Sequence, residues 1–228
     1  MLFNVYFYLG SSCIYALILC KLNKNWKMLV SDIDDVNIGY AEKNVSKNEM
    51  KNQIEGICVQ KHKILKIKLK NFNLVKKVEK QTLLKGLIGE SEEYDFIMTN
   101  PPFYKNYYEA QGLESTRKPY ERHDPSSINT AQDCECIFDE GGEIGFVKNI
   151  IDESVLLGSR IQIYTAMLGK KKSFIELKKY LTDVKKIDNI SEAQFCQGHT
   201  IRWGLAWTFR QAKLSTFKYM KVLSNIHH

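Results

Sequence analysis

Apolar residues along the chain occur either in short continuous runs or at the three- and four-residue spacing of a helix. Short runs indicate buried strands of a parallel sheet, which are apolar on both faces, and helical spacing indicates helices that cover the sheet. The predicted strands cover residues 3–8, 26–30, 95–98 and 160–167, and the predicted helices cover residues 13–20, 36–47, 141–157 and 173–181. Because strands and helices alternate, the pattern predicts an α/β fold with a mostly parallel sheet.

The last apolar stretch has a different pattern. Residues 184–209 predict two antiparallel strands, and the second of them, at residues 200–209, is apolar on both faces. The expected fold is therefore a Rossmann-like, mostly parallel sheet that ends in a C-terminal antiparallel hairpin. We expect one core domain at residues 1–210, followed by a C-terminal tail at residues 211–228.

The stretch YDFIMTNPPFY, at residues 94–104, joins a predicted strand to a rigid polar turn that we call the elbow (residues 100–103). Pro101 and Pro102 remove two backbone donors and fix two φ angles, so the chain can continue neither the strand nor a helix there. The amide oxygen of Asn100 and the carbonyl of Pro101 remain free to accept hydrogen bonds, and Phe103 offers a ring for stacking. These groups suit a planar ligand that carries an NH2 group.

Methylation of an exocyclic amine explains why these residue types occur together. The nitrogen of an adenine or amide NH2 group shares its lone pair with the adjacent π system and is a poor nucleophile. Hydrogen bonds to both N–H groups favour a pyramidal nitrogen, and orientation of the lone pair towards a methyl donor lowers the barrier further. A simple turn after a strand is the alternative interpretation. We predict that Asn100, Pro101, Pro102 and Phe103 form a catalytic site.

An acidic residue follows the second predicted strand. Asp32 lies 22 residues beyond Gly10, the spacing at which Rossmann-like domains place a carboxylate that binds ribose hydroxyls. Asp34 and Asp35 are better suited to capping the next helix, whose first turn favours negative charge. Asp32 is therefore the predicted nucleotide-binding carboxylate.

Composition limits the possible classes of protein. A chain of 228 residues with 44% hydrophobic and 26% charged residues fits one α/β domain, and a net charge of +7 favours a polyanionic partner. The six cysteines have no paired metal-binding spacing, so we expect reduced thiols and no metal. Residues 1–20 have the length of a membrane anchor, but the glycine and serines at their centre favour a strand, a turn and a helix, and we expect no membrane association.

Two further segments carry positive charge. Residues 61–80 contain eight lysines, which form either a solvated surface or a phosphate-binding surface. Residues 105–128 form a long polar and aromatic segment directly after the elbow, which includes Arg117 and Arg122. A segment of this kind beside a catalytic turn can close over a substrate.

Several stretches of the chain match the pattern of one known family. They are GSSCIY (10–15), DIDDVNIGYAEKNV (32–45), QTLL (81–84), the elbow stretch, PSSINT (125–130), EGGEIGFVKNII (140–151), MLGKK (167–171) and FCQGHTIRWGLAW (195–207). Together they resemble the RNA N6-adenosine methyltransferases that modify U6 small nuclear RNA and the S-adenosylmethionine synthetase messenger, the methyltransferase-like sixteen family. The stretches occur in order through nearly the whole chain. The elbow occurs in many amino-methyltransferases, whereas its combination with the last stretch is specific.

The resemblance implies a class I methyltransferase that uses S-adenosyl-L-methionine to methylate adenine N6 in a structured RNA. The residues it implies at the donor pocket are Gly10, Ser12, Asp32, Thr82 and Asn100. It implies that the elbow receives the adenine, and the RNA-binding residues expected with it are Lys105, Arg117, Arg122 and Arg202. It also implies nuclear localisation, possibly with a cytoplasmic fraction, and we expect a monomer.

Some residues depart from the family pattern. Tyr6 and Tyr8 replace residues of the donor loop, His199 replaces an arginine, and residues 62–75 are expected to be an insertion. The N-terminal RNA-binding segment of the family is expected to be missing, and residues 1–9 and 62–75 can alternatively be errors in the predicted reading frame. The departures at Tyr6 and Tyr8 leave open an RNA-binding pseudoenzyme with a degenerate donor pocket. A glutamine-N5 protein methyltransferase is a second alternative, because related elbows carry out the same chemistry on a glutamine side chain.

Overall fold

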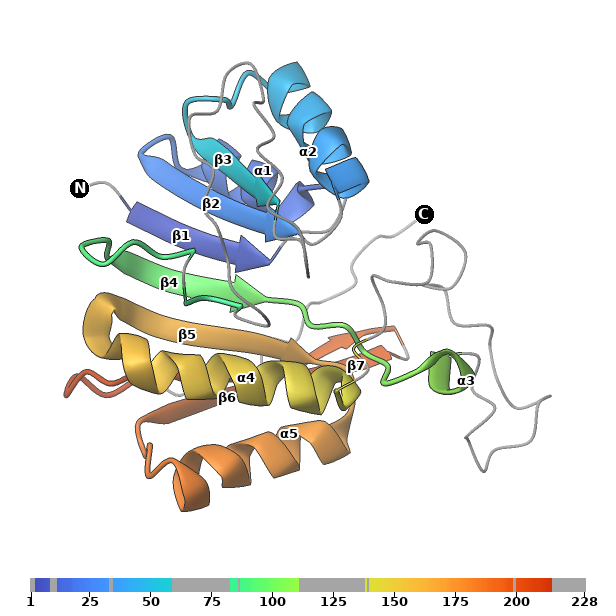
Figure 1. Ribbon diagram of the computed structural model, residues 1–228, viewed down its shortest axis with the longest axis vertical. Helices are drawn as coiled ribbons and strands as arrows, with labels where there is room; N and C mark the ends of the chain where they lie inside the picture. Colours follow the sequence, from blue (N-terminus) through green and yellow to red (C-terminus); the bar gives the residue numbers. More distant parts are fainter. Residues whose placement is uncertain are drawn as a thin grey trace.

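The computed structural model describes residues 3–8, 12–32, 35–58, 83–85, 87–110, 138, 140–198 and 200–214 of the chain. Within them, seven strands form one sheet in the order β3-β2-β1-β4-β5-β7-β6 (Figure 1). The strands are β1 (Phe3–Tyr8), β2 (Trp26–Asp32), β3 (Ile54–Cys58), β4 (Tyr94–Thr99), β5 (Ile161–Leu168), β6 (Ile190–Gln197) and β7 (Thr200–Trp207). Neighbouring strands are parallel except for β5–β7 and β6–β7, which are antiparallel. The predicted fold class is confirmed.

Helices cover the two faces of this sheet (Figure 1). The covering helices are α1 (Ile14–Leu22), α2 (Asp35–Lys47), α4 (Gly142–Leu157) and α5 (Lys171–Lys179). The short helix α3 (Tyr107–Ala110) lies beside the sheet in Figure 1. Successive residues of β2 belong to different cores: Met28 and Val30 pack in a cluster with α1 and α2, whereas Leu29 packs in the cluster that contains α4 and α5. Because side chains alternate between the faces of a strand, the two helix pairs lie on opposite faces of the sheet.

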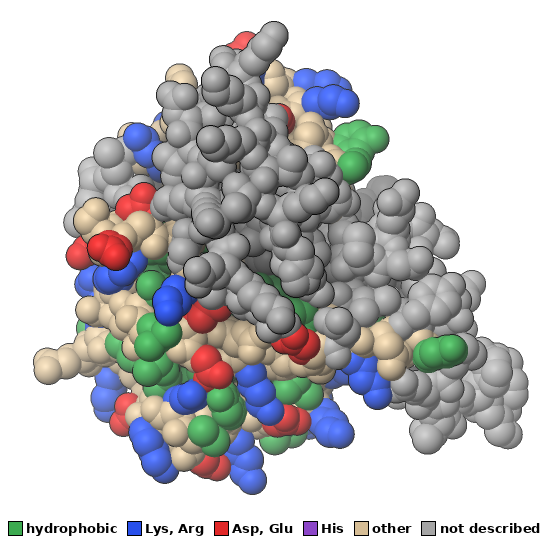
Figure 2. All heavy atoms as spheres, in the orientation of Figure 1, with side chains coloured by type: hydrophobic (Ala, Val, Ile, Leu, Met, Phe, Trp, Pro, Cys, Tyr) green, Lys and Arg blue, Asp and Glu red, His purple; other side chains and the backbone are tan. Residues whose placement is uncertain are grey.

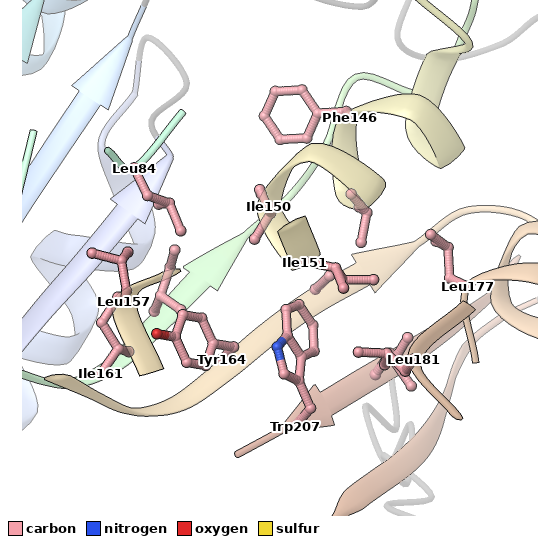
Figure 3. Packing of buried hydrophobic residues seen from close by; sticks show 14 of the residues in the cluster. Leu84, Phe146, Ile150, Ile151, Leu157, Ile161, Tyr164, Leu177, Leu181 and Trp207 are labelled. Atoms are coloured by element: carbon pink, nitrogen blue, oxygen red, sulfur yellow. The ribbon is translucent and has the colours of Figure 1, made fainter. Parts of the chain in front are cut away.

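The larger core lies between α4, α5 and the strands β5 and β7 (Figure 3). The rings of Tyr164 and Trp207 stack there with their centroids 5.6 Å apart. The indole Nε1 of Trp207 donates to Ser154 Oγ at 3.0 Å, so the polar atom of this buried ring has a partner. This core fixes α4 against the strand that precedes α5.

The predicted elements differ from the observed ones in detail. The strand β3 was not predicted, because Glu55 and Gly56 interrupt its apolar pattern. The last strand ends at Trp207 instead of residue 209. Directly after it, the Thr208 backbone N–H donates to the carbonyl of Asn189 at 3.2 Å, and Thr208 Oγ1 donates to the carbonyl of Gln162 at 2.5 Å. The double glycine before α4 has positive φ at Gly141 and Gly142, a conformation that suits glycine.

Residues 1–20 contain β1 and the first part of α1, as the strand-turn-helix interpretation predicts. Among the residues that the structure describes, no helix has the length and apolar character needed to cross a bilayer.

Candidate active site

The elbow follows β4 at the carboxyl edge of the parallel strands. Phe7 of β1 aligns with Val30 of β2 and with Met98 of β4, so Asp32 and Asn100 both come two residues later, at the same level of the sheet. One strand, β1, separates them, which corresponds to two strand spacings of about 4.8 Å each. The helix α1 follows β1, and α4 is the first long helix after β4; these two helices lie on opposite faces of the sheet. The chain therefore leaves β1 and β4 in opposite directions, which opens a crevice between their carboxyl ends, and ligands of open α/β sheets bind at such a crevice. Asp32 and Asn100 therefore lie at the same edge of the sheet, on either side of the end of β1.

Asn100 has a buried acceptor at this crevice. Among the described residues, no donor lies within hydrogen-bonding distance of its Oδ1 atom. Leaving a buried acceptor unsatisfied costs about 1–3 kcal/mol, and such a cost is common where a ligand supplies the missing donor. Asn100 also lines a cavity of about 380 Å³, beside Tyr15 of α1 and Met98 of β4. The amide is thus placed to accept an N–H from a bound molecule.

The rest of the elbow is held in the protein at several points. Pro101 and Pro102 are buried and Phe103 is half-buried. The Arg202 guanidinium lies over the ring of Phe103, 5.4 Å from its centroid. This arginine, which the sequence placed near an RNA path, therefore contacts the predicted stacking ring directly.

Three charged residues around the elbow were not predicted as site residues. Lys170 Nζ donates to the backbone carbonyl of Phe103 at 3.1 Å and forms an ion pair with Glu109. The other oxygen of Glu109, Oε2, accepts the backbone N–H of Lys105 at 2.8 Å. Burial alone would raise the pKa of Glu109, but the Lys105 N–H and the Lys170 ammonium outweigh it and lower this pKa. The carboxylate thus joins the segment after the elbow to the turn after β5.

The third residue is Glu143, in the first turn of α4. Its side chain is buried, and its Oε2 accepts the backbone N–H of Gly169 at 2.7 Å. Burial raises the pKa of Glu143, and hydrogen bonds from Ser173 and Gly169 offset only part of this effect. Glu143, Gly169 and Lys170 belong to the stretches EGGE and MLGKK, which supported the resemblance without being assigned a role.

The predicted donor-pocket residues are only partly described. Asp32 is buried at the end of β2, with 3% of its surface exposed. Ser12 is exposed just before α1, and its carbonyl accepts an N–H from Asn44 at 3.1 Å. Gly10 and Thr82 lie outside the described residues. Asp32 therefore lies at the same edge of the sheet as Asn100, but neither Asp32 nor Phe103 lines the cavity that Asn100 lines. All the donor contacts stay predictions.

A buried glutamate anchors the segment that follows Thr82. Glu153 of α4 accepts the backbone N–H groups of Leu83 at 2.8 Å, and of Leu84 and Lys85 at 2.6 Å. Three such bonds to one carboxylate fix this segment against α4. The sequence gave no signal for this contact, because the two partners are about 70 residues apart.

Of the predicted RNA-binding residues, Lys105 and Arg202 are described and lie around the elbow. Arg117, Arg122, His199 and the lysine-rich residues 61–80 lie outside the described residues. On the face with α4 and α5, basic and acidic side chains are intermixed (Figure 2), and pairs such as Lys148–Glu176 and Lys178–Glu192 lie within 3.0 Å. The described part of this face is therefore a poor site for a polyanion.

The described residues also include possible metal ligands and the buried thiol of Cys13. Among these described residues, no group of three or more His, Cys, Asp or Glu side chains is arranged to hold a metal ion. Burial raises the pKa of Cys13 to about 12, so this thiol is not a nucleophile at neutral pH.

The parallel sheet with an antiparallel edge pair, the acidic residue after β2 and the Asn-Pro-Pro-Phe elbow after β4 define a class I methyltransferase. A family model described as RNA methyltransferase matches residues 5–211, and the chain belongs to this family. The human RNA N(6)-adenosine-methyltransferase METTL16 is 41% identical over 202 residues, which cover 88% of this chain and 32% of the human protein. The chain thus spans about a third of the length of this relative.

Two solved structures of the human relative are similar to this fold. The hMettl16 catalytic domain in complex with MAT2A 3′UTR hairpin 1 has a TM-score of 0.76 and 36% identity, covering 96% of this chain and 68% of that chain. The N-terminal domain of human METTL16 in complex with SAH has a TM-score of 0.64 and 31% identity, covering 92% of this chain and 62% of that chain. Both the fold and the family predicted from the sequence are confirmed.

Proposed function

We propose that this chain is the catalytic core of an RNA N6-adenosine methyltransferase that transfers a methyl group from S-adenosyl-L-methionine to an adenine in a structured RNA. One observation carries the proposal: the buried Oδ1 of Asn100 lacks a donor among the described residues, at the carboxyl end of β4. The carbonyl of Pro101 and the ring of Phe103 follow within three residues. Together these groups match the NH2 group and the flat ring of adenine.

The residues at the crevice fit the methyl donor. The carboxylate of Asp32 can accept hydrogen bonds from ribose hydroxyls, and its position after β2 is the usual one for this role. The SAH complex of the human relative supports the same ligand class here. When bound, the donor supplies an electrophilic methyl group on a sulfonium. Gly10, Ser12 and Thr82 stay predicted contacts of this donor.

The elbow lowers the barrier by holding the amine. Asn100 Oδ1 and the Pro101 carbonyl accept its two N–H groups, while Phe103 stacks on the base. The nitrogen lone pair then forms a bond to the methyl carbon as the carbon–sulfur bond breaks, and the positive charge moves from sulfur to nitrogen. The methylated nitrogen is acidic and releases one proton to water, so no strong base is needed at the site. Preorganised acceptors and orientation supply the rate enhancement.

Positive charge at the elbow supports an RNA substrate. Lys105 is exposed and Arg202 is half-exposed beside Phe103, where they can contact phosphates flanking the target adenine. The hairpin complex of the human relative supports a folded RNA as the substrate class. Nuclear localisation and a monomeric state remain predictions that accompany this proposal.

The test is a methylation assay with the purified chain, labelled S-adenosyl-L-methionine and a hairpin RNA that contains a single target adenine. Mass analysis of the digested RNA is expected to show N6-methyladenosine. Asn100→Ala is expected to lower turnover about 100-fold or more, because a preorganised acceptor is lost. Asn25→Ala, at an exposed asparagine distant in sequence from the elbow, is the matched control and is expected to retain full activity.

Three results would contradict the proposal. The first is equal turnover in Asn100→Ala and the parent protein. The second is methylation of a glutamine-containing peptide but not of RNA, which would support the glutamine-N5 hypothesis. The third is calorimetric binding of RNA without measurable binding of S-adenosyl-L-methionine, which would support a pseudoenzyme.

A further inference from the structure

The turn after β5 is packed against the ring of Phe103. Gly169 lies in this turn, and a Cβ atom added to it would lie 2.8 Å from Cδ1 and 3.1 Å from Cε1 of Phe103. Ordinary Cβ contacts are longer, so the ring lies closer to this backbone than any side chain at Gly169 would allow. The position of the β5–α5 turn therefore limits where the Phe103 ring can lie.

Glu143 fixes this turn from the interior. Its buried Oε2 accepts the Gly169 N–H at 2.7 Å, so the backbone that contacts Phe103 is hydrogen-bonded to α4. The carboxylate lies in the first turn of α4, where the helix dipole favours negative charge. A buried bond between a carboxylate and a backbone N–H is short and directional. It holds Gly169 at a fixed distance from the helix.

Lys170 fixes the elbow on its other side. Its ammonium donates to the carbonyl of Phe103 at 3.1 Å, pairs with Glu109, and lies 5.5 Å from the centroid of the Tyr104 ring. The backbone of Phe103 is thus bonded to the residue after Gly169, while the ring of Phe103 contacts Gly169 itself. Ring and backbone of the same residue are held by two neighbouring residues of one turn.

We propose that Glu143 and Lys170 are positioning residues that orient the ring of Phe103 for stacking on the substrate base. This inference rests on the proposed function, because it assigns Phe103 as the stacking ring. Neither residue is required to touch the substrate. They act through the Gly169–Lys170 turn, and loss of either contact lets the ring and the adjacent Pro101 carbonyl move relative to the bound amine. A displacement of about 1 Å at a reacting centre can lower turnover about 100-fold.

Lys170→Met is the first test variant, because it keeps the length of the side chain and removes the ammonium. We expect turnover to fall about 10- to 100-fold at saturating RNA, while the affinity for S-adenosyl-L-methionine changes less than twofold. Lys170→Arg, which can still donate to the carbonyl and to Glu109, is expected to recover part of the turnover. Glu143→Leu, which removes both acceptor oxygens, is the second variant and is expected to lower turnover in the same way.

Lys148→Met is the matched control. Lys148 also pairs with a glutamate, Glu176, at 2.7 Å, and its ammonium lies 5.3 Å from the centroid of an aromatic ring, that of Tyr180. It has the same kind of partners as Lys170 without a bond to the elbow. The two variants are therefore expected to shift the melting temperature by similar amounts, and only Lys170→Met is expected to lower turnover.

A second measurement reports on the ring without requiring activity. 4-Fluorophenylalanine incorporated at position 103 gives a fluorine NMR signal that depends on the surroundings of the ring. We expect this signal to shift or broaden in Lys170→Met and in Glu143→Leu, and to stay unchanged in Lys148→Met.

Several outcomes would overturn the inference. An unchanged fluorine signal in both variants would contradict the positioning role whether or not the protein methylates RNA. Unchanged turnover in both variants of an active protein would contradict it as well. A loss confined to the KM for RNA in Lys170→Met would instead assign Lys170 to direct contact with RNA. A parent protein that methylates no RNA refutes the proposed function, and the fluorine signal then still decides whether this turn positions Phe103.

Discussion

The two halves of the sheet are built differently. We call β1, β2 and β3 with α1 and α2 the donor half, and β4, β5, β7 and β6 with α4 and α5 the acceptor half. The cluster that packs against α1 and α2 contains mainly small and flexible side chains, such as Ala16, Cys20 and Met28. The cluster that packs against α4 and α5, on the other face of the sheet, contains the stacked rings of Tyr164 and Trp207. The acceptor half therefore has the better-defined packing.

The halves also differ at their carboxyl edges. In the acceptor half, Glu143, Glu109 and Lys170 bond to the backbone around the elbow. In the described part of the donor half, Asp32 is the predicted ligand-binding carboxylate, and it lies at the end of a strand. Under the proposed function, this difference indicates that the elbow is held in place before the target amine binds. The predictions that follow test this difference, from the largest expected effect to the smallest.

The largest expected effect is on the core of the acceptor half. Trp207→Ala is expected to lower the free energy of unfolding by about 3–5 kcal/mol, since it removes a buried ring and its hydrogen bond to Ser154. Met28→Ala in the donor half is expected to cost about 2–3 kcal/mol, because methionine adapts to irregular space. Urea unfolding measures both. An equal or larger cost for Met28→Ala would remove the proposed difference in packing.

Alanine substitution of two glycines, one in each half, is expected to change the stability in opposite directions. A Cβ at Gly145 of α4 would lie 1.9 Å from the carbonyl oxygen of Glu140, so Gly145→Ala is expected to destabilise by about 1–3 kcal/mol. A Cβ at Gly39 of α2 would meet no atom within 4 Å, so Gly39→Ala is expected to stabilise the protein by about 0.5–1 kcal/mol. Thermal unfolding of the two variants shows whether each is more or less stable than the parent protein. A stabilising Gly145→Ala would contradict the close approach of α4 to the segment before it.

In the donor half, substitution of Asp32 is expected to weaken the binding of S-adenosyl-L-methionine. Asp32→Asn keeps the size of the side chain and removes the charge, and we expect the affinity for S-adenosyl-L-methionine to fall about tenfold, or ~1.4 kcal/mol. Calorimetric titration measures the change. Asp183→Asn, at an exposed residue of the turn after α5, is the control and is expected to bind normally. An unchanged affinity in Asp32→Asn would contradict the predicted role of this carboxylate in donor binding.

The smallest expected effect is a pH dependence in the acceptor half. Burial raises the pKa of Glu143 above its ordinary value of 4.5, so the folded protein binds this proton more tightly than the unfolded chain does. The resulting stabilisation is fully present below pH 4.5 and is lost as the pH rises through the raised pKa. Glu143→Gln is expected to lack this decrease. The free energy of unfolding of the parent protein and of Glu143→Gln is measured from pH 4 to pH 8. Parallel curves for the two proteins would contradict the predicted contribution of Glu143.

Local sequence patterns predicted most of the fold. Apolar runs and helical spacing depend on residues within one element, so β1, β2, β4, β5 and the two long helices lie close to their expected bounds. The elbow and Asp32 were also identified locally, because a pair of prolines and an acidic residue after a strand restrict the backbone and the chemistry at that point. The strand β3 was missed, since Glu55 and Gly56 break its pattern.

The tertiary structure alone decided how the elbow is held. Glu143 reaches Gly169 across 26 residues, and Lys170 reaches Phe103 across 67. Glu153 reaches Leu83 across 70. A buried charged side chain and a solvated one look the same in a sequence, because the distinction depends on which distant backbone groups the fold brings within hydrogen-bonding distance. The sequence therefore predicted which groups bind the amine, and the packing of α4 and the β5–α5 turn decided which residues hold the elbow.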